Sequence, residues 1–102
     1  MTEMDKLENY LKDHGFQYER NKNIGQFLDE LEITIGVRDQ IIVYDNEKRD
    51  WDAICQPGSY GYEQGLLEVM GDRVVRPSDG DSVCGYLTAQ DVIDRLEGKD
   101  EE

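Results

Sequence analysis

The most reactive side chains in this sequence are two cysteines, Cys55 and Cys84, and the single histidine, His14. A thiol nucleophile needs a base beside it and a third group that orients the base. Cys55 with His14 as base and Asp52 as orienting group is the candidate arrangement. The chain is acidic, however, and neighbouring carboxylates disfavour the thiolate form of a cysteine. The composition therefore favours a buried, unreactive Cys55 and a surface histidine over a catalytic site.

Two other segments have residue types that bind ions. Residues 57–61 (PGSYG) precede a predicted helix, and helix N-termini bind anions through their free N–H groups. No lysine follows, and the glycine spacing matches neither a phosphate loop nor a dinucleotide fingerprint. Asp79 and Asp81 offer oxygen ligands for a divalent cation, but the ligand series of an EF-hand is missing. We predict no catalytic residue, no metal site and no cofactor.

Aromatic and acidic residues are more informative, because they gather around residues 50–68. Tyr60 and Tyr62 flank Gly61, and Trp51 and several carboxylates lie close by in sequence. An aromatic patch with an acidic rim is typical of a surface that recognises a basic partner. Alternatively, Trp51 and Tyr62 belong to the core, which still leaves Tyr60 and the acidic rim exposed. The candidate partner-binding residues are Asp52, Ser59, Tyr60, Tyr62, Glu63 and Glu68.

Charge and length limit the functions of the chain. It has 102 residues, 24 acidic against 11 basic, and a net charge of −13. Residues 52–102 carry 12 acidic and 4 basic side chains. This charge repels nucleic-acid backbones and anionic membranes, so we predict neither as a direct partner. We expect one domain over residues 1–98, a frayed acidic tail over 99–102, and a cytoplasmic location, since no signal peptide or membrane span is recognisable.

The first half of the chain predicts one helix and several strands. Thr2 and Asp5 form a capping box for a helix over residues 3–14, which Gly15 ends. Residues 16–19 alternate apolar and polar side chains as a strand does. Residues 21–25 are polar and predict an exposed connection. Residues 26–36 fit either helix or strand, and we favour a short turn that enters a strand.

A β-hairpin over residues 40–55 is the centre of the predicted fold. Residues 41–44 are continuously apolar, which is typical of a strand covered on both faces. After a polar turn, Trp51, Ala53 and Cys55 alternate with Asp52. We expect these three residues on one face of the sheet and Asp52 on the other.

The second half predicts two further helices. Ser59 is a suitable N-cap for a helix over residues 60–70, whose buried face would carry Tyr62, Leu66, Val69 and Met70. Gly65 would then lie inside a helix, at a cost of about 1 kcal/mol relative to alanine, which indicates close packing on the sheet. Residues 74–75 predict a short extended segment, 76–82 a loop and 83–87 a strand. Thr88 and Asp91 form a capping box for a last helix over 89–97.

Two segments, WDAICQPGSYGYEQGLLEVMG and GYLTAQDVIDRLEG, resemble a family of small acidic uncharacterised proteins of bacterial mobile elements. The resemblance covers residues 40–98 and is strongest over 51–71. It implies a compact α+β domain, and it assigns no catalytic role to any residue. It also implies a genomic setting in which acidic inhibitors of restriction or CRISPR nucleases occur.

Together these features predict an α+β domain with an antiparallel sheet of three to five strands around the central hairpin. About three helices should pack mainly on one face of the sheet. The leading functional hypothesis is a non-enzymatic protein that presents carboxylates to a basic, nucleic-acid-binding partner, as a DNA mimic does. One alternative is a small enzyme or ligand-binding module with a concave pocket that reaches Cys55, Tyr60 and Glu63. Another is an oligomeric accessory protein that associates through the open face of its sheet, and the oligomeric state stays undetermined.

Overall fold

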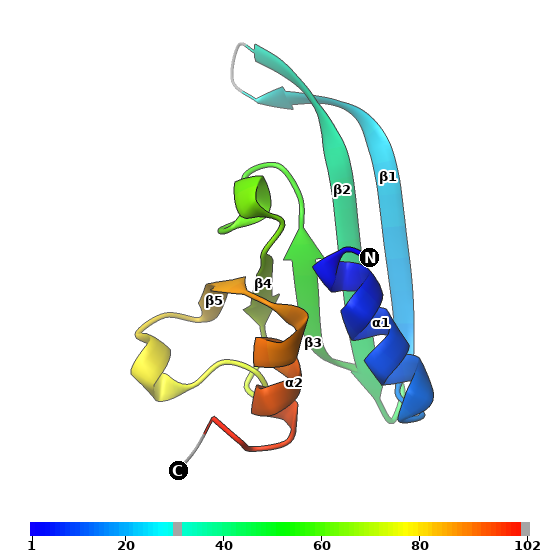
Figure 1. Ribbon diagram of the computed structural model, residues 1–102, viewed down its shortest axis with the longest axis vertical. Helices are drawn as coiled ribbons and strands as arrows, with labels where there is room; N and C mark the ends of the chain where they lie inside the picture. Colours follow the sequence, from blue (N-terminus) through cyan, green and yellow to red (C-terminus); the bar gives the residue numbers. More distant parts are fainter. Residues whose placement is uncertain (30–31, 101–102) are drawn as a thin grey trace.

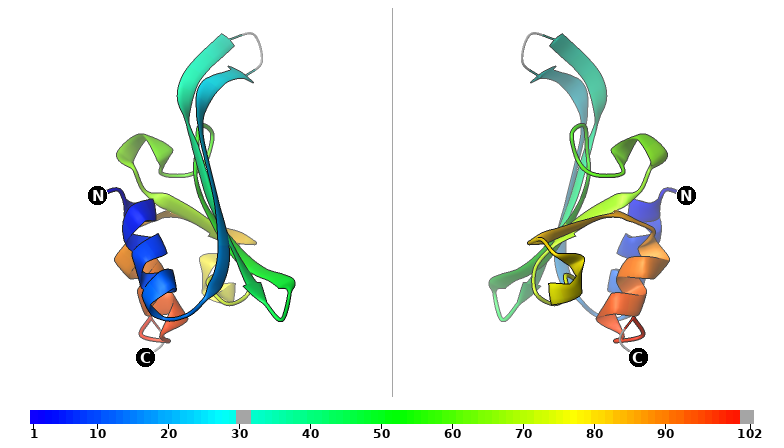
Figure 2. Two further views of the ribbon diagram at one scale, coloured as in Figure 1. Left: turned by 90° about the vertical axis from the view of Figure 1, so that its right-hand side faces the viewer. Right: turned by 90° about the vertical axis from the view of Figure 1, so that its left-hand side faces the viewer.

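The computed structural model describes the backbone of residues 1–29 and 32–100 and the side chains of residues 1–23 and 37–100. A five-stranded antiparallel sheet has the strand order β1-β2-β3-β4-β5. Two α-helices lie side by side on one face of it, and no helix of the described residues covers the other face (Figures 1 and 2). The elements are α1 (Glu3–Asp13), β1 (Gln17–Asp29), β2 (Glu32–Asp45), β3 (Lys48–Cys55), η1 (Tyr62–Gln64), β4 (Leu67–Met70), η2 (Pro77–Asp79), β5 (Val83–Leu87) and α2 (Ala89–Leu96).

The α+β class is therefore confirmed, with two of the three predicted α-helices present among the described residues. Both capping boxes form. Thr2 accepts a hydrogen bond from the Asp5 N–H at 3.1 Å, and the Asp5 side chain accepts one from the Thr2 N–H at 3.0 Å. Thr88 and Asp91 form the same pair of bonds at 3.1 and 2.9 Å. These bonds satisfy N–H groups that have no partner inside a helix, so α1 and α2 begin where the sequence predicts.

The central hairpin is confirmed. β2 and β3 pair from Asp39 with Cys55 to Asp45 with Lys48, and Asn46 and Glu47 form the turn with φ values of 51° and 68°. Two residues with positive φ give the turn whose twist matches that of paired strands. The expectation that residues 41–44 are covered on both faces is wrong: Ile41 and Val43 are buried, whereas Ile42 is only half-buried. The reason is that the helices pack on one face alone.

The core lies between that face and the two helices. Trp51 is its largest side chain and is 1% exposed, so the tryptophan belongs to the core and not to a surface patch. The fully buried residues come from α1, from the three central strands and their connections, and from α2. They are Met4, Leu7, Leu11, Ile41, Val43, Trp51, Ala53, Leu67, Val69, Val74, Ala89 and Val92. Burial of this apolar set is the main force that holds the two layers together.

The helix predicted over residues 60–70 is wrong. In its place the chain forms a loop, the three-residue turn η1 and then strand β4. Gly61 and Gly65 both have left-handed backbone angles, with φ of 96° and 72°, which interrupt a right-handed helix. Leu67 and Val69 are buried while Met70 is 51% exposed, so the segment follows the two-residue repeat of a strand. The apolar residues in this short segment fitted both periods.

The exposed connection predicted over residues 21–25 is also wrong. β1 runs unbroken through it, because its pairing with β2 extends from Gln17–Tyr44 to Asp29–Glu32. Residues 26–29 are likewise strand and not a turn, and residues 30–31 lie outside the described residues. Since β3 pairs with β2 only from Asp39 onward, the far half of the β1–β2 ladder projects as a two-stranded arm (Figure 1). The polar side chains of Asn21, Lys22 and Asn23, which lie at the base of this arm, are exposed.

In the C-terminal third, the structure agrees more closely with the prediction from the sequence. β5 and α2 occupy the predicted segments, whereas Val74 lies in a turn and not in an extended segment. In the predicted tail, Asp100 accepts hydrogen bonds from Arg76 at 3.1 and 3.2 Å, and the last two residues lie outside the described part of the chain. No helix among the described residues is long and apolar enough to cross a membrane.

Replacing Gly65 distinguishes the observed turn from the predicted helix by the sign of the effect. In a helix, Gly65→Ala would stabilise the protein by about 1 kcal/mol. In the observed turn φ is 72°, so we expect the same change to lower the free energy of unfolding by about 1 kcal/mol. Chemical denaturation measures the difference.

Gly71→Ala is the matched comparison and should be more damaging than Gly65→Ala. Its new Cβ would lie 2.6 Å from the Cβ of Trp51 and 2.8 Å from the Asp50 carbonyl oxygen, whereas a Cβ at Gly65 meets nothing within 4 Å. A stabilising Gly65→Ala would contradict the turn.

Candidate partner-binding site

Most arginines of this protein form ion pairs with its own carboxylates. Arg20 on β1 binds Asp39 of β2 through two bonds of 3.0 and 2.7 Å, and it also donates to Asp5 and Glu8 of α1 at 3.0 and 2.9 Å. The hydrogen bonds that Arg20 donates to Asp39, and to a lesser degree those to Asp5 and Glu8, raise the pKa of Arg20, whereas burial opposes them. Arg20 therefore ties the first helix to the sheet through charge-assisted hydrogen bonds.

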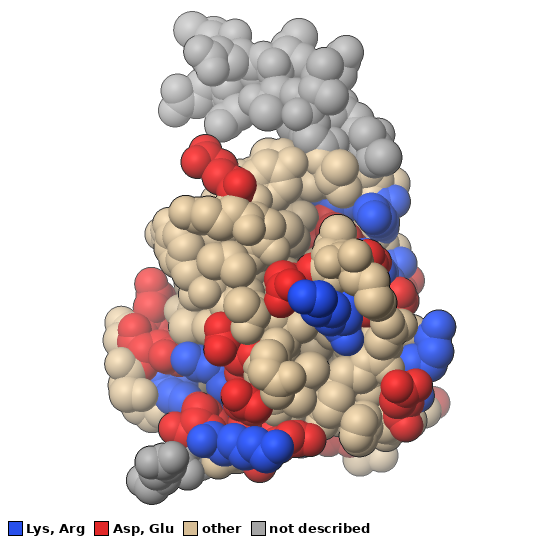
Figure 3. Space-filling view, viewed as in Figure 1, with Lys and Arg blue, Asp and Glu red and all other residues tan. Residues whose placement is uncertain are grey.

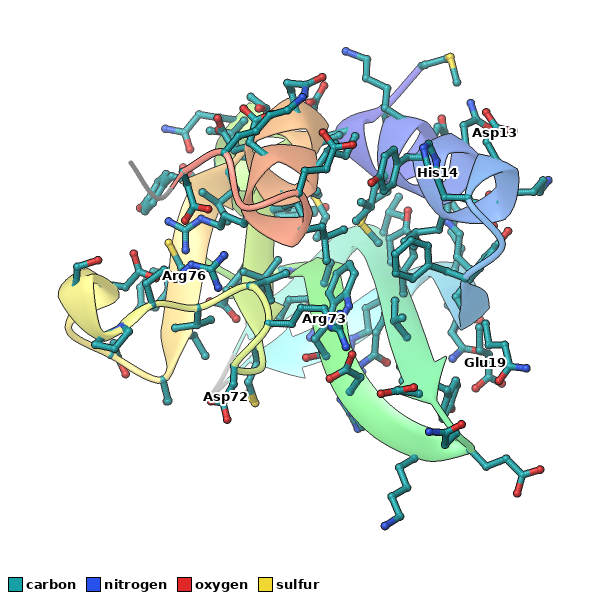
Figure 4. All side chains as sticks on the ribbon, turned by 90° about the horizontal axis from the view of Figure 1, so that it is seen from below. Asp13, His14, Glu19, Asp72, Arg73 and Arg76 are labelled. Atoms are coloured by element: carbon teal, nitrogen blue, oxygen red, sulfur yellow. The ribbon has the colours of Figure 1, made fainter. Side chains whose placement is uncertain are left out.

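Two more arginines tie α2 and η2 together. Arg95 binds both carboxylate oxygens of Asp79 at 2.7 and 3.1 Å and donates to the Val74 carbonyl at 2.8 Å. The bonds from Arg95 lower the pKa of Asp79 to about 2. Arg76 donates to the Arg95 carbonyl and to Asp100. Figure 4 labels Arg73 and Arg76, which both belong to the segment between β4 and η2.

Internal pairing leaves a large excess of carboxylate at the surface. Seven of the eleven basic side chains form ion pairs within the described residues: Lys6, Arg20, Arg49, Arg73, Arg76, Arg95 and Lys99. No ion pair reaches the exposed carboxylates of Asp13, Glu47, Glu63 and Asp72 within the part of the chain described here. They come from the end of α1, the β2–β3 turn, η1 and the turn after β4, so several separate elements contribute to the exposed negative charge.

A small hollow of about 270 Å³ lies between the loop before η1 and strand β5. We call Tyr60, Tyr62, Glu63 and Tyr86, which line this hollow, the tyrosine site. The other lining residues are Gly58, Ser59, Gly61 and Gln64. In Figure 3 the surface over η1 shows no Lys or Arg, and a carboxylate side chain lies at its edge. The hollow is thus aromatic and acidic in character.

Tyr60 and Tyr86 are the exposed aromatic pair of this site. They are 56% and 58% exposed, and their ring centroids lie 6.4 Å apart with a tilt of 31°. The Tyr86 N–H donates to the Tyr60 carbonyl at 3.4 Å, and the Tyr60 N–H donates to Glu68 Oε1 at 3.1 Å. The backbones that carry the two exposed rings are therefore joined directly, and Glu68 holds that of Tyr60 in addition.

Close backbone packing maintains this arrangement. A Cβ at Gly85 would clash with the Cβ of Tyr60, and a Cβ at Gly61 would lie 3.1 Å from the Cα of Tyr86. Tyr86 itself has φ of 59°, a left-handed conformation that is unusual for a bulky residue. Such strain persists only where surrounding contacts impose it, and it is concentrated at functional sites.

The structure brings together five of the six predicted partner-binding residues and separates the sixth. Ser59 closes the loop through bonds with the backbone of Gln56, so it caps a turn and not the predicted helix. Tyr62 is half-buried, and its hydroxyl accepts from the Val37 N–H at 3.3 Å. Asp52 does not line the hollow: it lies on the sheet face that the helices leave open, where Gln40 and Arg49 donate to it at 3.1 and 3.0 Å.

Sequence reasoning missed Tyr86, although β5 itself was predicted. The available signal was Gly85, since a glycine inside a strand often marks close approach of another backbone. The partner of that glycine, Tyr60, lies 25 residues earlier in the chain. Nothing local to β5 could indicate it.

A second cavity of about 450 Å³, which we call the Cys55 cavity, lies on the other side of η1. It is lined by the N-terminus of α1, the base of the arm, the end of β3 and η1, through Thr2, Met4, Lys22, Val37, Asp39, Cys55, Tyr62, Glu63 and Gly65. It reaches Cys55 and Glu63 as the pocket hypothesis expects, with Tyr62 in the place of Tyr60. Burial, and to a lesser degree the charge of Asp39, raises the pKa of the Cys55 thiol.

The thiol arrangement of Cys55, His14 and Asp52 is not assembled. His14 lies at the end of α1, where its ring stacks on Tyr10 with centroids 4.0 Å apart (Figure 4). It lines a different, open hollow beside the β2–β3 turn, and Asp52 lies on the far face of the sheet. With neither His14 nor Asp52 beside it, Cys55 acts as an apolar wall residue of its cavity.

The two ion-binding segments have no built site either. Three-residue η1 replaces the helix that an anion site would need. Asp79 of the proposed cation loop is held by Arg95, and its Oδ2 also accepts from the Arg76 N–H at 2.7 Å. Among the described residues no group of three or more His, Cys, Asp or Glu side chains is placed to hold a metal ion.

Comparison of the chain with protein-family models, with curated proteins and with solved structures finds no match. The roles of the residues described above therefore rest on geometry and chemistry alone.

The raised pKa of Cys55 predicts slow alkylation in the folded protein. In a Cys84→Ser background, iodoacetamide should react with Cys55 more slowly than with a free thiol near neutral pH, because only the thiolate is nucleophilic. The rate should continue to rise above the pH at which a free thiol is fully ionised, since burial shifts the pKa upward. Mass spectrometry gives the rate as a function of pH. Denaturant should restore the rate of a free thiol, and a full rate in the native protein at pH 7 would exclude this environment.

Proposed function

We propose that this protein is a non-enzymatic interaction protein that binds a basic protein partner through its carboxylate-rich surface. The observation that carries the proposal is the carboxylate excess left after internal ion pairing, together with the exposed aromatic pair beside Glu63. Aromatic residues with an acidic rim match a positively charged protein surface better than they match a nucleic acid or an anionic membrane.

A nucleic-acid-binding protein is the partner class that we propose. Such proteins carry clustered Lys and Arg side chains that bind the phosphate groups of nucleic acids. Exposed carboxylates can bind to the same Lys and Arg side chains in place of phosphates. The protein would then act as an inhibitor or regulator of that partner, in the manner of a DNA mimic. The resemblance to small acidic proteins of bacterial mobile elements favours the same class.

Salt dependence tests this proposal. The immobilised protein is used to isolate its partner from a cell lysate at low salt, and the dissociation constant of the purified pair is then measured over a salt series. We expect the affinity to fall about tenfold or more between about 0.05 M and 0.5 M salt, as the screening length shrinks from roughly 14 Å to roughly 4 Å. An affinity that is indifferent to salt would contradict the proposal.

A triple variant in which three carboxylates are replaced by neutral amides makes the same test more specific. Glu47→Gln, Glu63→Gln and Asp72→Asn remove exposed carboxylates that form no ion pair within the described residues, so they should flatten the salt dependence without weakening the fold. The matched control changes three exposed neutral residues, through Asn9→Ala, Gln17→Ala and Ser78→Ala. This control should keep the salt dependence of the unmodified protein.

The Cys55 cavity supports a second candidate function, the binding of a small, mainly apolar molecule. Its volume lies within the range of small-molecule sites, roughly 300–1,000 Å³. Met4, Val37 and Cys55 supply apolar walls, while Lys22 and Glu63 supply charges of opposite sign. This combination of an apolar body and a few polar groups is typical of ligand pockets.

A cavity-filling variant tests the second candidate. Anilinonaphthalenesulfonate, a fluorescent apolar anion, should bind saturably to the unmodified protein, with its sulfonate near Lys22. Cys55→Leu should reduce this binding severalfold, because the larger side chain fills the cavity. Cys84→Val is the matched control at the other cysteine and should leave the binding unchanged. Equal binding to the Cys55→Leu variant would remove the cavity as the site.

A further inference from the structure

We propose that the tyrosine site binds an arginine side chain of the basic partner. The guanidinium would lie against the rings of Tyr60 and Tyr86, and the Glu63 carboxylate would accept its N–H bonds. This inference rests on the proposed function and names the group that the partner inserts.

The spacing of the two rings suits one shared cation. A cation is attracted to an aromatic ring when it lies within about 6 Å of the ring centroid. Because the two centroids are 6.4 Å apart, a single guanidinium can meet this distance for both rings. Both side chains are more than half exposed, so their rings are accessible without any rearrangement of the core.

The site is also organised before a partner arrives. The bond from the Tyr86 N–H to the Tyr60 carbonyl and the packing of Gly85 against Tyr60 hold the two backbones together. The left-handed conformation of Tyr86 shows that these contacts override the intrinsic preference of the residue. Because the backbones that carry the two rings are already fixed, binding costs less conformational entropy than it would on a flexible loop, which strengthens an otherwise small contact.

The charge around the site selects a cation and disfavours an anion. Glu63 is exposed and lines the hollow, and none of the lining residues is basic. Glu68 lies beside the site, with one carboxylate oxygen bound to the Tyr60 N–H. An incoming cation therefore meets two carboxylates and no competing internal ion pair at Glu63 among the described residues.

Arginine fits this geometry better than lysine. A guanidinium is planar, so it can stack on an aromatic ring and donate two parallel N–H bonds to a carboxylate at the same time. An ammonium is a strongly hydrated point charge that makes only the electrostatic part of this contact. The arrangement thus predicts a preference between two side chains of equal charge.

An NMR titration with three short peptides tests the inference directly. The peptides share a glycine framework and carry arginine, lysine or the neutral isostere citrulline at the centre. We expect the arginine peptide to shift the amide signals of Tyr60, Gly61, Glu63 and Tyr86, the lysine peptide to bind more weakly, and the citrulline peptide to leave these signals unchanged. Equal binding of the citrulline peptide, or shifts confined to other regions, would overturn the assignment.

Variants at the two tyrosines identify the contact. Tyr86→Asn removes the ring, and asparagine tolerates a left-handed backbone, so the fold should survive. We expect the dissociation constant of the arginine peptide to rise about fivefold or more with Tyr86→Asn or Tyr60→Leu, a factor typical of a cation–aromatic contact. Tyr44→Leu, which replaces a half-buried tyrosine of β2, should have no effect. An unchanged constant with Tyr86→Asn in a folded protein would overturn the assignment.

A carboxylate pair separates local recognition from net charge. Glu63→Gln and Asp72→Asn each remove one exposed charge, but only Glu63 lines the hollow. The inference requires Glu63→Gln to weaken binding of the arginine peptide severalfold more than Asp72→Asn does. Equal effects would show that the peptide responds only to the overall charge, and they would overturn the site.

Failure of this inference can be told apart from failure of the proposed function. If the isolated partner binds with steep salt dependence and Tyr86→Asn binds it as tightly as the unmodified protein, the arginine assignment is wrong and the charge-driven function stands. If partner affinity is indifferent to salt, the proposed function is wrong whatever the peptides show. If added salt and Tyr86→Asn each weaken binding of the partner, both proposals are supported.

Discussion

The structure depends on ion pairs that a few arginines form between separate elements of an acidic chain. Arg20 joins two carboxylates of α1 to one on β2, and it does so at 12% side-chain exposure. Arg95 joins α2 to η2 in the same way. Each of these guanidinium groups bridges elements that are distant in sequence and thereby offsets the repulsion between the carboxylates it joins. Because the basic groups are committed to the fold, the surplus of negative charge is left to the surface.

Packing on one face of the sheet gives the molecule two different sides. The helices cover one face of the sheet (Figure 2). That face carries the buried Trp51 and Ala53, whereas Asp52 and its polar partners lie on the other. The loop before β4 lies at the margin of the covered face. There it separates two hollows, and Tyr62 and Glu63 line both of them. One turn of chain therefore supplies walls to an apolar cavity and to an aromatic, acidic one.

The elements that could be predicted are those whose signals are local. The capping boxes at Thr2 and Thr88 define helix starts through bonds that span three residues, and the hairpin is set by a short polar turn between apolar segments. The helix prediction over residues 60–70 failed because the apolar spacing from Tyr62 to Met70 fits a helix as well as a strand. Pairing of β4 with β3 and β5, together with left-handed Gly65, decided between them. The candidate site was found in part: Tyr60, Tyr62 and Glu63 are neighbours in sequence, but Tyr86 is not.

Sequence alone determined the α+β class, the central hairpin, the starts of α1 and α2 and the excess of negative charge, since each follows from composition or from residues a few positions apart. Tertiary structure alone decided which aromatic side chains are exposed. Trp51 lies in the core because its face of β3 is the one that the helices cover, and the half-buried Tyr62 accepts a bond from the Val37 N–H. Tyr86 joins Tyr60 because Gly85 and Gly61 let two distant backbones approach. Such pairing depends on contacts across the fold, and no local pattern of residues contains it.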